Sequence, residues 1–311
     1  MGTGQGLATG AIGLGTLGLA GGYGGVDADE AVRAVRTALD LGTTLIDTAD
    51  FYGGGEVERL VGRAVAGRRD EAVIATRGGA VFTDGARPTA FDGSPAFLRR
   101  ACDASLARLG TDVIDLYYLA RPDPSVPVEE TVGGLAALVE AGKVRHIGLS
   151  EVPAGLLRRA HAVHPVTALE SEYSLWSRGL EDDVLPTARE LGVGLVAHSP
   201  LGRGFLAGTL SSADQLGPAD YRRRQERFAT GNLARDHARL EPARAIARRH
   251  GVPLATLALA WLLAQDPHLV PIPGSRSDEH LRQNATACDL SLDRTELDTL
   301  AAVLTVRPNA S

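Results

Sequence analysis

The sequence contains few of the residues on which several protein chemistries depend. Only two of its 311 residues are cysteines, Cys102 and Cys288, and they lie too far apart for a disulfide framework or a typical metal site. We expect both to be small buried residues. Lys143 is the single lysine among 32 basic residues, and it lies in a turn before a strand. Chemistry that needs a free amine, such as Schiff-base formation, therefore has one candidate, which we expect to be solvated.

The sequence also lacks a strong excess of charge of one sign and lacks long hydrophobic runs. The net charge is −6, and acidic and basic residues are interspersed, so no basic stripe indicates nucleic-acid binding. No apolar run reaches the length of a membrane span, and residues 1–10 lack the features of a signal peptide. We therefore expect a soluble cytoplasmic protein without a nucleic-acid or membrane partner, whose oligomeric state stays open.

Short apolar segments alternate with amphipathic ones along the whole chain. Eight of them are strand-sized and almost continuously apolar, which is typical of parallel strands buried on both faces. They are residues 12–14, 44–46, 72–75, 113–118, 145–149, 167–169, 194–197 and 269–272. The segments between them have helical periodicity, and glycines follow several of the predicted helices. Eight strand–helix units predict an α/β protein with one domain over residues 1–311, a closed (β/α)8 TIM barrel.

An open, doubly wound sheet is the alternative to the barrel. That fold does not need eight regular units, and the glycine fingerprint that it uses for a dinucleotide is absent. Gly13, Gly15 and Gly18 resemble this fingerprint only superficially, because no helix follows them immediately. The longest irregular stretch runs from Gly202 to about Arg239, and a loop of that length is usually a lid or a binding loop.

The strongest candidate for chemistry lies where the second predicted strand ends. The carboxyl ends of the strands carry the active site in barrels of this kind. Asp47 follows a buried strand, and Tyr52 lies five residues later beside a glycine-rich turn. A phenol with a pKa of about 10 is a poor acid near neutrality unless a cation stabilises its anion. The structural alternative is that Asp47 caps a loop and that Tyr52 is a half-buried aromatic residue.

Four motifs, in order along the chain, resemble those of the aldo-keto reductase family. They are IDTADFYGGGEVERLVGRAV, ALESEYSLWSR, SPLGRGFLAG and VPIPGSRSDEHLRQN. The likeness extends from Ile12 to about Leu300 and is greatest to a bacterial subgroup with a long loop after the seventh strand. The family reduces carbonyl groups with NADPH, and a tyrosine donates the proton with help from an aspartate, a lysine and a histidine. The resemblance implies a small-molecule substrate, with Tyr52 as the acid and Asp47 as its supporting carboxylate.

Four positions depart from the family's pattern. The usual lysine is Arg77, which keeps the charge but replaces an ammonium by a planar fork. The usual histidine is Ala120, which has no donor, acceptor or titratable group, and we expect the Arg77 guanidinium to lean into the space beside it. The glutamine that grips the nicotinamide carboxamide is Glu170, which when ionised can only accept hydrogen bonds. The aromatic residue that stacks on the nicotinamide is His198, which could stack, supply the lost acid–base function or be purely structural.

The phosphate-binding end resembles the family more closely. Gly274, Ser275 and Arg276 precede a predicted helix, whose N-terminus and neighbouring guanidinium suit an adenosine 2′-phosphate, so NADP(H) is favoured over NAD(H). The resemblance implies that further cofactor contacts come from Ser150 at the carboxamide, from Ser199, Leu201, Gly202 and Arg203 beside the pyrophosphate, and from Gln283 and Asn284 at the adenine. We also expect Tyr23 and Trp176 to border the pocket.

Three functions stay open at this point. A retained Asp47 and Tyr52 favour an NADPH-dependent reductase with an atypical catalytic set, completed by Arg77 and His198. The changes at the hydride-transfer positions would also suit a redox-neutral enzyme, such as a dehydratase, lyase or cyclase of secondary metabolism. A non-catalytic nucleotide-binding subunit ranks last, because such a subunit would need neither Asp47 nor Tyr52.

Overall fold

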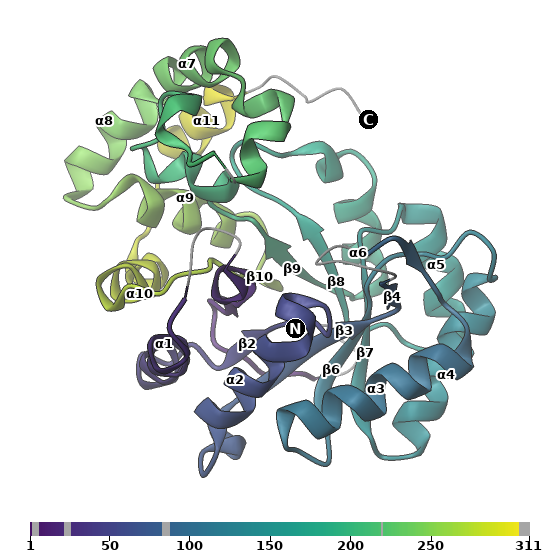
Figure 1. The fold of residues 1–311 in the computed structure, drawn as a ribbon. Coiled ribbons are helices and arrows are strands. Elements are labelled where there is room, and N and C mark those ends of the chain that lie inside the picture. The colour runs from purple at the N-terminus through teal and green to yellow at the C-terminus, as the bar shows by residue number, and fades with distance from the viewer. Residues whose placement is uncertain (2–5, 22–25, 83–87, 219, 305–311) are drawn as a thin grey trace.

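The computed structural model describes residues 1, 6–21, 26–82, 88–218 and 220–304, which leaves the predicted pocket residue Tyr23 outside the described part. Eight parallel strands form one curled sheet (Figure 1). In their order across the sheet they are β1 (Leu14–Gly15), β2 (Leu45–Asp47), β3 (Val73–Gly78), β6 (Ile114–Leu119), β7 (Val144–Ser150), β8 (Ala168–Glu172), β9 (Gly194–His198) and β10 (Leu269–Pro271). Hydrogen bonds from Gly13 N to Pro271 O (2.9 Å) and from Gly15 N to Pro273 O (3.4 Å) join the first strand to the last. The predicted (β/α)8 barrel is confirmed.

Helices follow the strands and surround the sheet (Figure 1). They are α1 (Ala28–Asp40), α2 (Glu56–Val65), α3 (Pro95–Leu109), α4 (Val128–Glu140), α5 (Ala154–Val163), α6 (Val184–Leu191), α7 (Thr230–Arg239), α8 (Glu241–His250), α9 (Leu254–Leu263), α10 (Asp278–Ala285) and α11 (Arg294–Val303). Ser94 caps the start of α3, because its side chain accepts a hydrogen bond from Phe97 N and Pro95 occupies the first helical position. Within the described ranges, no helix is long and apolar enough to cross a membrane.

Two strands extend further than their apolar segments predict. β3 continues through Thr76 and Arg77, and β8 continues through Glu170 to Glu172. These residues are polar, so the apolar pattern ends before the strand does. The strand ends nevertheless lie in the sheet, because Arg77 pairs with Tyr118 in β6 and Glu172 pairs with His198 in β9. The extensions carry polar side chains to the carboxyl end of the barrel.

Two expectations are corrected by the structure. Cys102 is buried in α3, but Cys288 is exposed, so only one cysteine packs in the core. The stretch from Gly202 to Arg239 is not an irregular loop throughout, since it contains short 3₁₀ helices and ends in α7. Phe205, Phe228 and Leu233 from this stretch are fully buried, which explains why it folds against the barrel.

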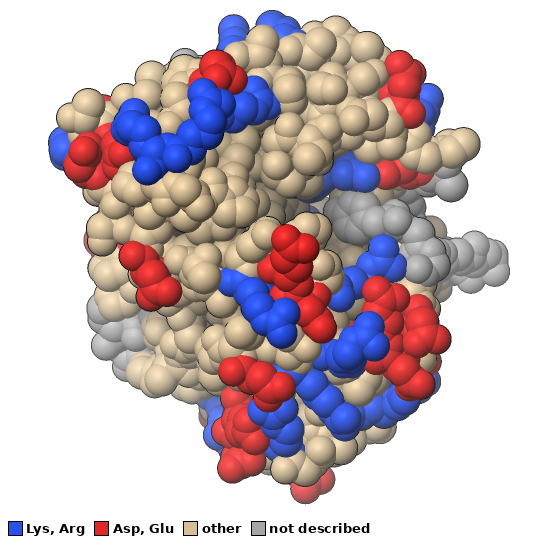
Figure 2. All heavy atoms as spheres, turned by 90° about the vertical axis from the view of Figure 1, so that its left-hand side faces the viewer, with Lys and Arg blue, Asp and Glu red and all other residues tan. Residues whose placement is uncertain are grey.

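One face of the molecule, over the left-hand helices of Figure 1, is shown with all its atoms in Figure 2. Acidic and basic side chains are mixed on this face rather than separated by sign. Charged side chains on the helices also pair with one another, as when Arg63 of α2 contacts Asp29 of α1 at 2.9 Å. Because such exposed pairs contribute at most about 1 kcal/mol each, the fold depends mainly on its core.

Two helical glycines provide a test of how closely the helices pack. A Cβ atom at Gly62 in α2 would overlap the carbonyl oxygen of Leu109 in α3, whereas a Cβ at Gly133 in α4 would meet nothing within 4 Å. We expect Gly62→Ala to lower the free energy of unfolding by about 1–3 kcal/mol, because the helices must separate. Gly133→Ala should raise it by about 0.5–1 kcal/mol through helix propensity. Urea unfolding of both variants checks this, and equal effects would contradict it.

Candidate active site

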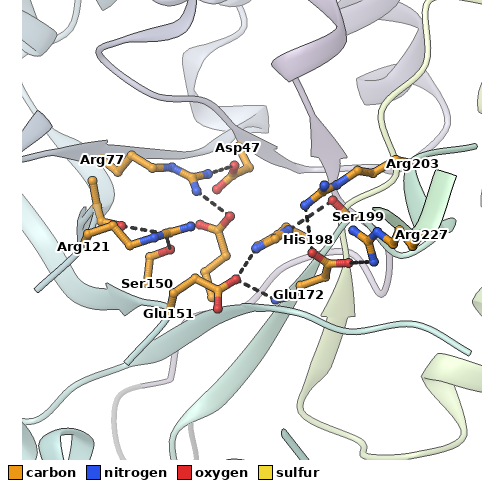
Figure 3. A network of polar contacts seen from close by, with 12 residues as sticks. Asp47, Arg77, Arg121, Ser150, Glu151, Glu172, His198, Ser199, Arg203 and Arg227 are labelled. Carbon is orange, nitrogen blue, oxygen red and sulfur yellow. Dashed lines mark hydrogen bonds and ion pairs between the residues drawn. The ribbon is translucent and has the colours of Figure 1, made fainter. Parts of the chain in front are cut away.

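The carboxyl ends of neighbouring strands bring the predicted polar residues to one end of the barrel. Figure 3 shows Asp47 and Arg77 on one side of this group and His198, Ser199 and Arg203 on the other. Asp47 ends β2, Ser150 ends β7 and His198 ends β9. Parallel strands end at the same edge of the sheet, so side chains far apart in the sequence become neighbours here.

Arg77 occupies the buried centre of the site between two carboxylates. Its NH2 group donates to Asp47 Oδ1, and its NH1 group donates to Glu170 Oε1 at 2.5 Å. Its Nε group donates to the carbonyl oxygen of Thr48 at 3.2 Å. Arg77 is 5% exposed, and Asp47 and Glu170 are each 1% exposed. Because an unpaired ion would be costly in such a place, the three charges depend on one another.

These contacts correct the expected direction of the Arg77 side chain. The guanidinium turns to Thr48, Asp47 and Glu170 rather than to the space beside Ala120, because each of its three nitrogens donates to one of them. A planar guanidinium can bridge two carboxylates, whereas a lysine ammonium acts as a point charge. The two departures at positions 77 and 170 therefore belong together, since Glu170 is the second acceptor of Arg77.

Burial decides which groups around Arg77 carry a proton. Burial, reinforced by the charge of Glu170 and opposed by Arg77, raises the pKa of Asp47 well above its usual range. Burial also raises the pKa of Tyr52, while Arg77, whose Cζ lies 5.8 Å from the tyrosine ring centre, acts in the opposite direction. Tyr52 is therefore a neutral phenol that carries its proton near neutral pH, and the charge of Arg77 partly offsets the effect of burial.

Two buried oxygens beside Arg77 have unused capacity to accept hydrogen bonds. Asp47 Oδ2 and Glu170 Oε2 have no hydrogen-bond partner among the described residues. Glu170 pairs in register with Ser150 on the adjacent strand, and the Ser150 side chain is also fully buried. An acceptor and a hydroxyl group thus lie side by side at the end of β7 and β8.

His198 and Glu151 form a second polar pair in the site. His198 Nε2 lies 2.5 Å from Glu151 Oε1, and its Nδ1 lies 3.2 Å from Ser199 Oγ. Burial alone would raise the pKa of Glu151, but the hydrogen bond with His198 and its neighbouring charges outweigh this effect, so the pKa is lowered. Glu151 and Ser199 both have positive φ angles, 54° and 51°, which non-glycine residues adopt rarely and mostly at functional sites. A carboxylate held in this way orients the imidazole for proton transfer.

Glu172 joins the segment after β9 to the barrel. Arg203 NH2 contacts Glu172 Oε2 at 2.9 Å, and Arg227 NH1 contacts Glu172 Oε1 at 2.7 Å (Figure 3). Arg222 adds support by donating to the carbonyl oxygen of Arg203 at 2.7 Å. Trp176, which we expect to border the pocket, is buried against this segment and stacks on Phe205 with ring centres 4.1 Å apart.

The residues predicted for the phosphate end lie around the start of α10. Ser277 caps this helix, and Ser275 Oγ accepts a hydrogen bond from Ser277 N at 3.1 Å. A Cβ atom at Gly274 would lie 2.9 Å from Gly15 O, so the backbone approaches β1 closely here. The other predicted residues lie in α10, where Asn284 is buried and Gln283 donates to Glu279, and after β9, where Ser199, Leu201 and Gly202 follow one another.

The sequence interpretation missed three polar residues of the site. They are Arg121, Glu151 and Glu172, and each lies one or two positions beyond a residue that was singled out. Arg121 NH1 donates to the carbonyl oxygen of Ala120 at 2.8 Å and to Ser150 Oγ at 2.9 Å. Their position just after a strand end was the available signal, because barrel sites are built from such positions.

Asp50 faces a separate hollow beyond Tyr52. The hollow has a volume of about 250 Å³ and is lined by Asp50, Ala80, Phe82, Phe97, Arg100, Ala101, Ala104 and Arg108. Asp50 Oδ1 is buried and has no hydrogen-bond partner among the residues described. Burial, and then the charge of the nearby Glu58, raises the pKa of Asp50 to about 7.

This raised pKa predicts a pH dependence of stability. Between the pKa of an unfolded aspartate, about 4, and about 7, the folded state binds more protons, so the free energy of unfolding falls as pH rises. Asp50→Asn cannot ionise, so it should gain on the order of 1–3 kcal/mol relative to wild type between pH 5 and pH 8. Urea unfolding at both pH values measures this, with exposed Asp70→Asn as the control. An Asp50→Asn variant that loses as much stability as wild type would contradict it.

Removing the central cation should expose the cost of the two buried carboxylates. We expect Arg77→Met to lower the free energy of unfolding at pH 7 by about 3–5 kcal/mol. The loss should be smaller at pH 5, because Asp47, whose pKa is raised by burial, can then take up a proton. Arg145→Met is the control, since Arg145 lies near the opposite end of β7 and its side chain is 63% exposed. Equal losses in the two variants at pH 7 would show that Arg77 is not the central cation.

Comparison with known proteins places this site in a family. The chain is similar to the glycerol dehydrogenase AKR11B4 from Gluconobacter oxydans, with a TM-score of 0.87 and 28% identity over 99% of this chain and 96% of that one. It is also similar to an aldo/keto reductase from Klebsiella pneumoniae in complex with NADP and acetate, with a TM-score of 0.76 and 30% identity over 97% of this chain and 94% of that one. A third similar structure is the aldo-keto reductase AKR11C1 from Bacillus halodurans, with a TM-score of 0.80 and 27% identity over 97% of this chain and 95% of that one. The Aldo/keto reductase family model matches residues 11–305. The chain therefore belongs to the aldo/keto reductase family.

Proposed function

We propose that this protein is an NADP(H)-dependent oxidoreductase that reduces the carbonyl group of a small organic substrate. One observation carries the proposal: Tyr52, a neutral phenol, lies beside Arg77, whose charge is balanced by Asp47 and Glu170. Family membership supports the reaction class, and a relative solved with NADP supports the cofactor.

The residues present fit a nicotinamide cofactor. A carboxamide offers an NH2 group that donates and an oxygen that accepts. The free Glu170 Oε2 would accept from the NH2 group, and the Ser150 hydroxyl on the adjacent strand would donate to the oxygen. Arg276, two residues before α10, would pair with the 2′-phosphate. When bound, NADPH supplies the hydride.

The remaining residues that we would place on the cofactor lie at two other elements. Ser199, Leu201, Gly202 and Arg203 would line the pyrophosphate, while Gly274 and Ser275 would lie beside the phosphates and Gln283 and Asn284 beside the adenine. Gly274 suits this role because its backbone lies against Gly15, where a side chain would not fit. Arg203 would have to keep or exchange its contact with Glu172 when a phosphate binds.

Tyr52 moves the proton in this scheme. Its hydroxyl donates to the carbonyl oxygen and transfers its proton as negative charge develops there. The Arg77 guanidinium stabilises the resulting tyrosinate, and Asp47 and Glu170 hold that guanidinium in place. Ala120 contributes nothing to the oxygen, so a donor is missing relative to the family's usual set.

A stoichiometric assay with a proton-donor variant tests this function. Wild-type protein, incubated with NADPH and a panel of small aldehydes and ketones, should consume one NADPH for each alcohol formed. We expect Tyr52→Phe to lower kcat by about 10²–10⁴-fold while NADPH fluorescence titration is unchanged. Tyr221→Phe, which removes a hydroxyl from the segment after β9, is the matched control and should behave as wild type.

The pair formed by His198 and Glu151 favours a second candidate, redox-neutral proton-transfer chemistry on the same barrel. An imidazole held by a carboxylate can remove and return a proton without any hydride transfer. In that case substrate would be converted without net loss of NADPH, and His198→Asn would abolish turnover while Tyr52→Phe would not. NADPH consumption equal to product formation would exclude this candidate, and nucleotide binding without any turnover would exclude both.

A further inference from the structure

The site lacks a hydrogen-bond donor for the substrate oxygen at the end of β6. Ala120 occupies this place, and it is 2% exposed and carries no polar side-chain atom. Arg77 is held on the other side of the site, because its three nitrogens donate to Thr48, Asp47 and Glu170. A reduction in which Tyr52 acts alone would leave the developing negative charge on the oxygen without a second donor.

Arg121 follows Ala120 and folds back over it. Its NH1 group donates both to the carbonyl oxygen of Ala120 (2.8 Å) and to Ser150 Oγ (2.9 Å). In the part of the chain that the structure describes, its Nε and NH2 groups donate to no acceptor, and it forms no ion pair. A half-buried guanidinium that is fixed through one nitrogen and free at the other two is ready to bind a ligand oxygen.

Arg121 lies on the side of the site that holds Arg77 and Ser150. Figure 3 shows its guanidinium close to Ser150 and on the same side as the pair formed by Arg77 and Asp47. Its positive charge acts to lower the pKa of both Tyr52 and Glu151, so it lies within electrostatic reach of the proton donor and of the second polar pair. The Ser150 contact also places it beside the expected position of the nicotinamide.

We propose that Arg121 is a catalytic residue that replaces the missing histidine by donating hydrogen bonds to the substrate carbonyl oxygen. The inference rests on the proposed reductase function. Hydride addition to the carbonyl carbon moves the π electron pair onto the oxygen, which takes the Tyr52 proton and becomes the alcohol. Nε and NH2 of Arg121 donate to that oxygen throughout, and the Tyr52 anion regains a proton from solvent after NADP⁺ and the alcohol have formed.

A guanidinium differs from the imidazole that it replaces. It stays protonated at every accessible pH, so it stabilises the oxygen's charge but cannot give up its own proton. Proton delivery then depends on Tyr52 alone. We therefore expect the rate–pH profile of the wild-type protein to show no titration of a histidine at position 120. An Ala120→His variant should introduce one.

Removal of the side chain tests the proposal directly. We expect Arg121→Ala to lower kcat by about 10²–10³-fold, as the loss of one preorganised donor does, with NADPH affinity by fluorescence unchanged. Added guanidinium ion at a non-denaturing concentration should restore part of the rate, which a merely structural role would not predict. Arg145→Ala, at the opposite end of β7, is the control and should show neither the loss nor the rescue.

A second variant restores the donor from another position. Ala120→His combined with Arg121→Ala should recover activity relative to Arg121→Ala and should acquire a pH dependence near the imidazole pKa, about 6.5. Unchanged kcat in Arg121→Ala would overturn the proposal while leaving the reductase function intact. If Arg121→Ala lost as much NADPH affinity as kcat/KM and guanidinium ion did not rescue it, Arg121 would only position Ser150, and the proposal would be wrong. A wild-type protein that binds NADPH but reduces no carbonyl compound would overturn the reductase function first and this inference with it.

Discussion

The ion cluster of Arg77, Asp47 and Glu170 is the interaction on which the active site depends. Two carboxyl groups share one guanidinium in a place that is almost inaccessible to water. If both carboxyl groups were ionised, one negative charge would lack a compensating cation. Burial and the charge of Glu170 accordingly raise the pKa of Asp47. The three members of the cluster come from β2, β3 and β8, so the arrangement exists only when the barrel is closed.

Most of the fold could be predicted from the sequence, because strands buried on both faces are almost continuously apolar. The predictions stopped short where β3 and β8 end in polar residues, since hydropathy does not distinguish a polar strand end from a loop. They also failed for α7, whose inward face is short and surrounded by charged residues. Cys288 was misplaced because the burial preference of cysteine is a tendency and not a constraint.

The site was harder to predict than the fold. The departures at positions 77, 120, 170 and 198 were visible in the sequence, but their connections were not. That Arg77 contacts Glu170, 93 positions away, depends on strand order and side-chain direction. Arg121 and Glu151 carried no motif of their own, and only the end of a strand marked them. The geometry divides the polar residues into a buried set around Arg77 and a more open set that includes His198.

The two contacts of Glu172 have a consequence for the segment that follows β9. One carboxylate holds Arg203 near the beginning of that segment and Arg227 near its end. It therefore acts as a non-covalent cross-link, which lowers the conformational entropy of the intervening chain as a disulfide would. Unlike a disulfide, this cross-link can open and close with ionic strength or with the arrival of a competing anion. The contacts of Glu172 can thus exchange while the buried Phe205 and Phe228 keep the segment on the barrel, a combination that a covalent bond would not permit.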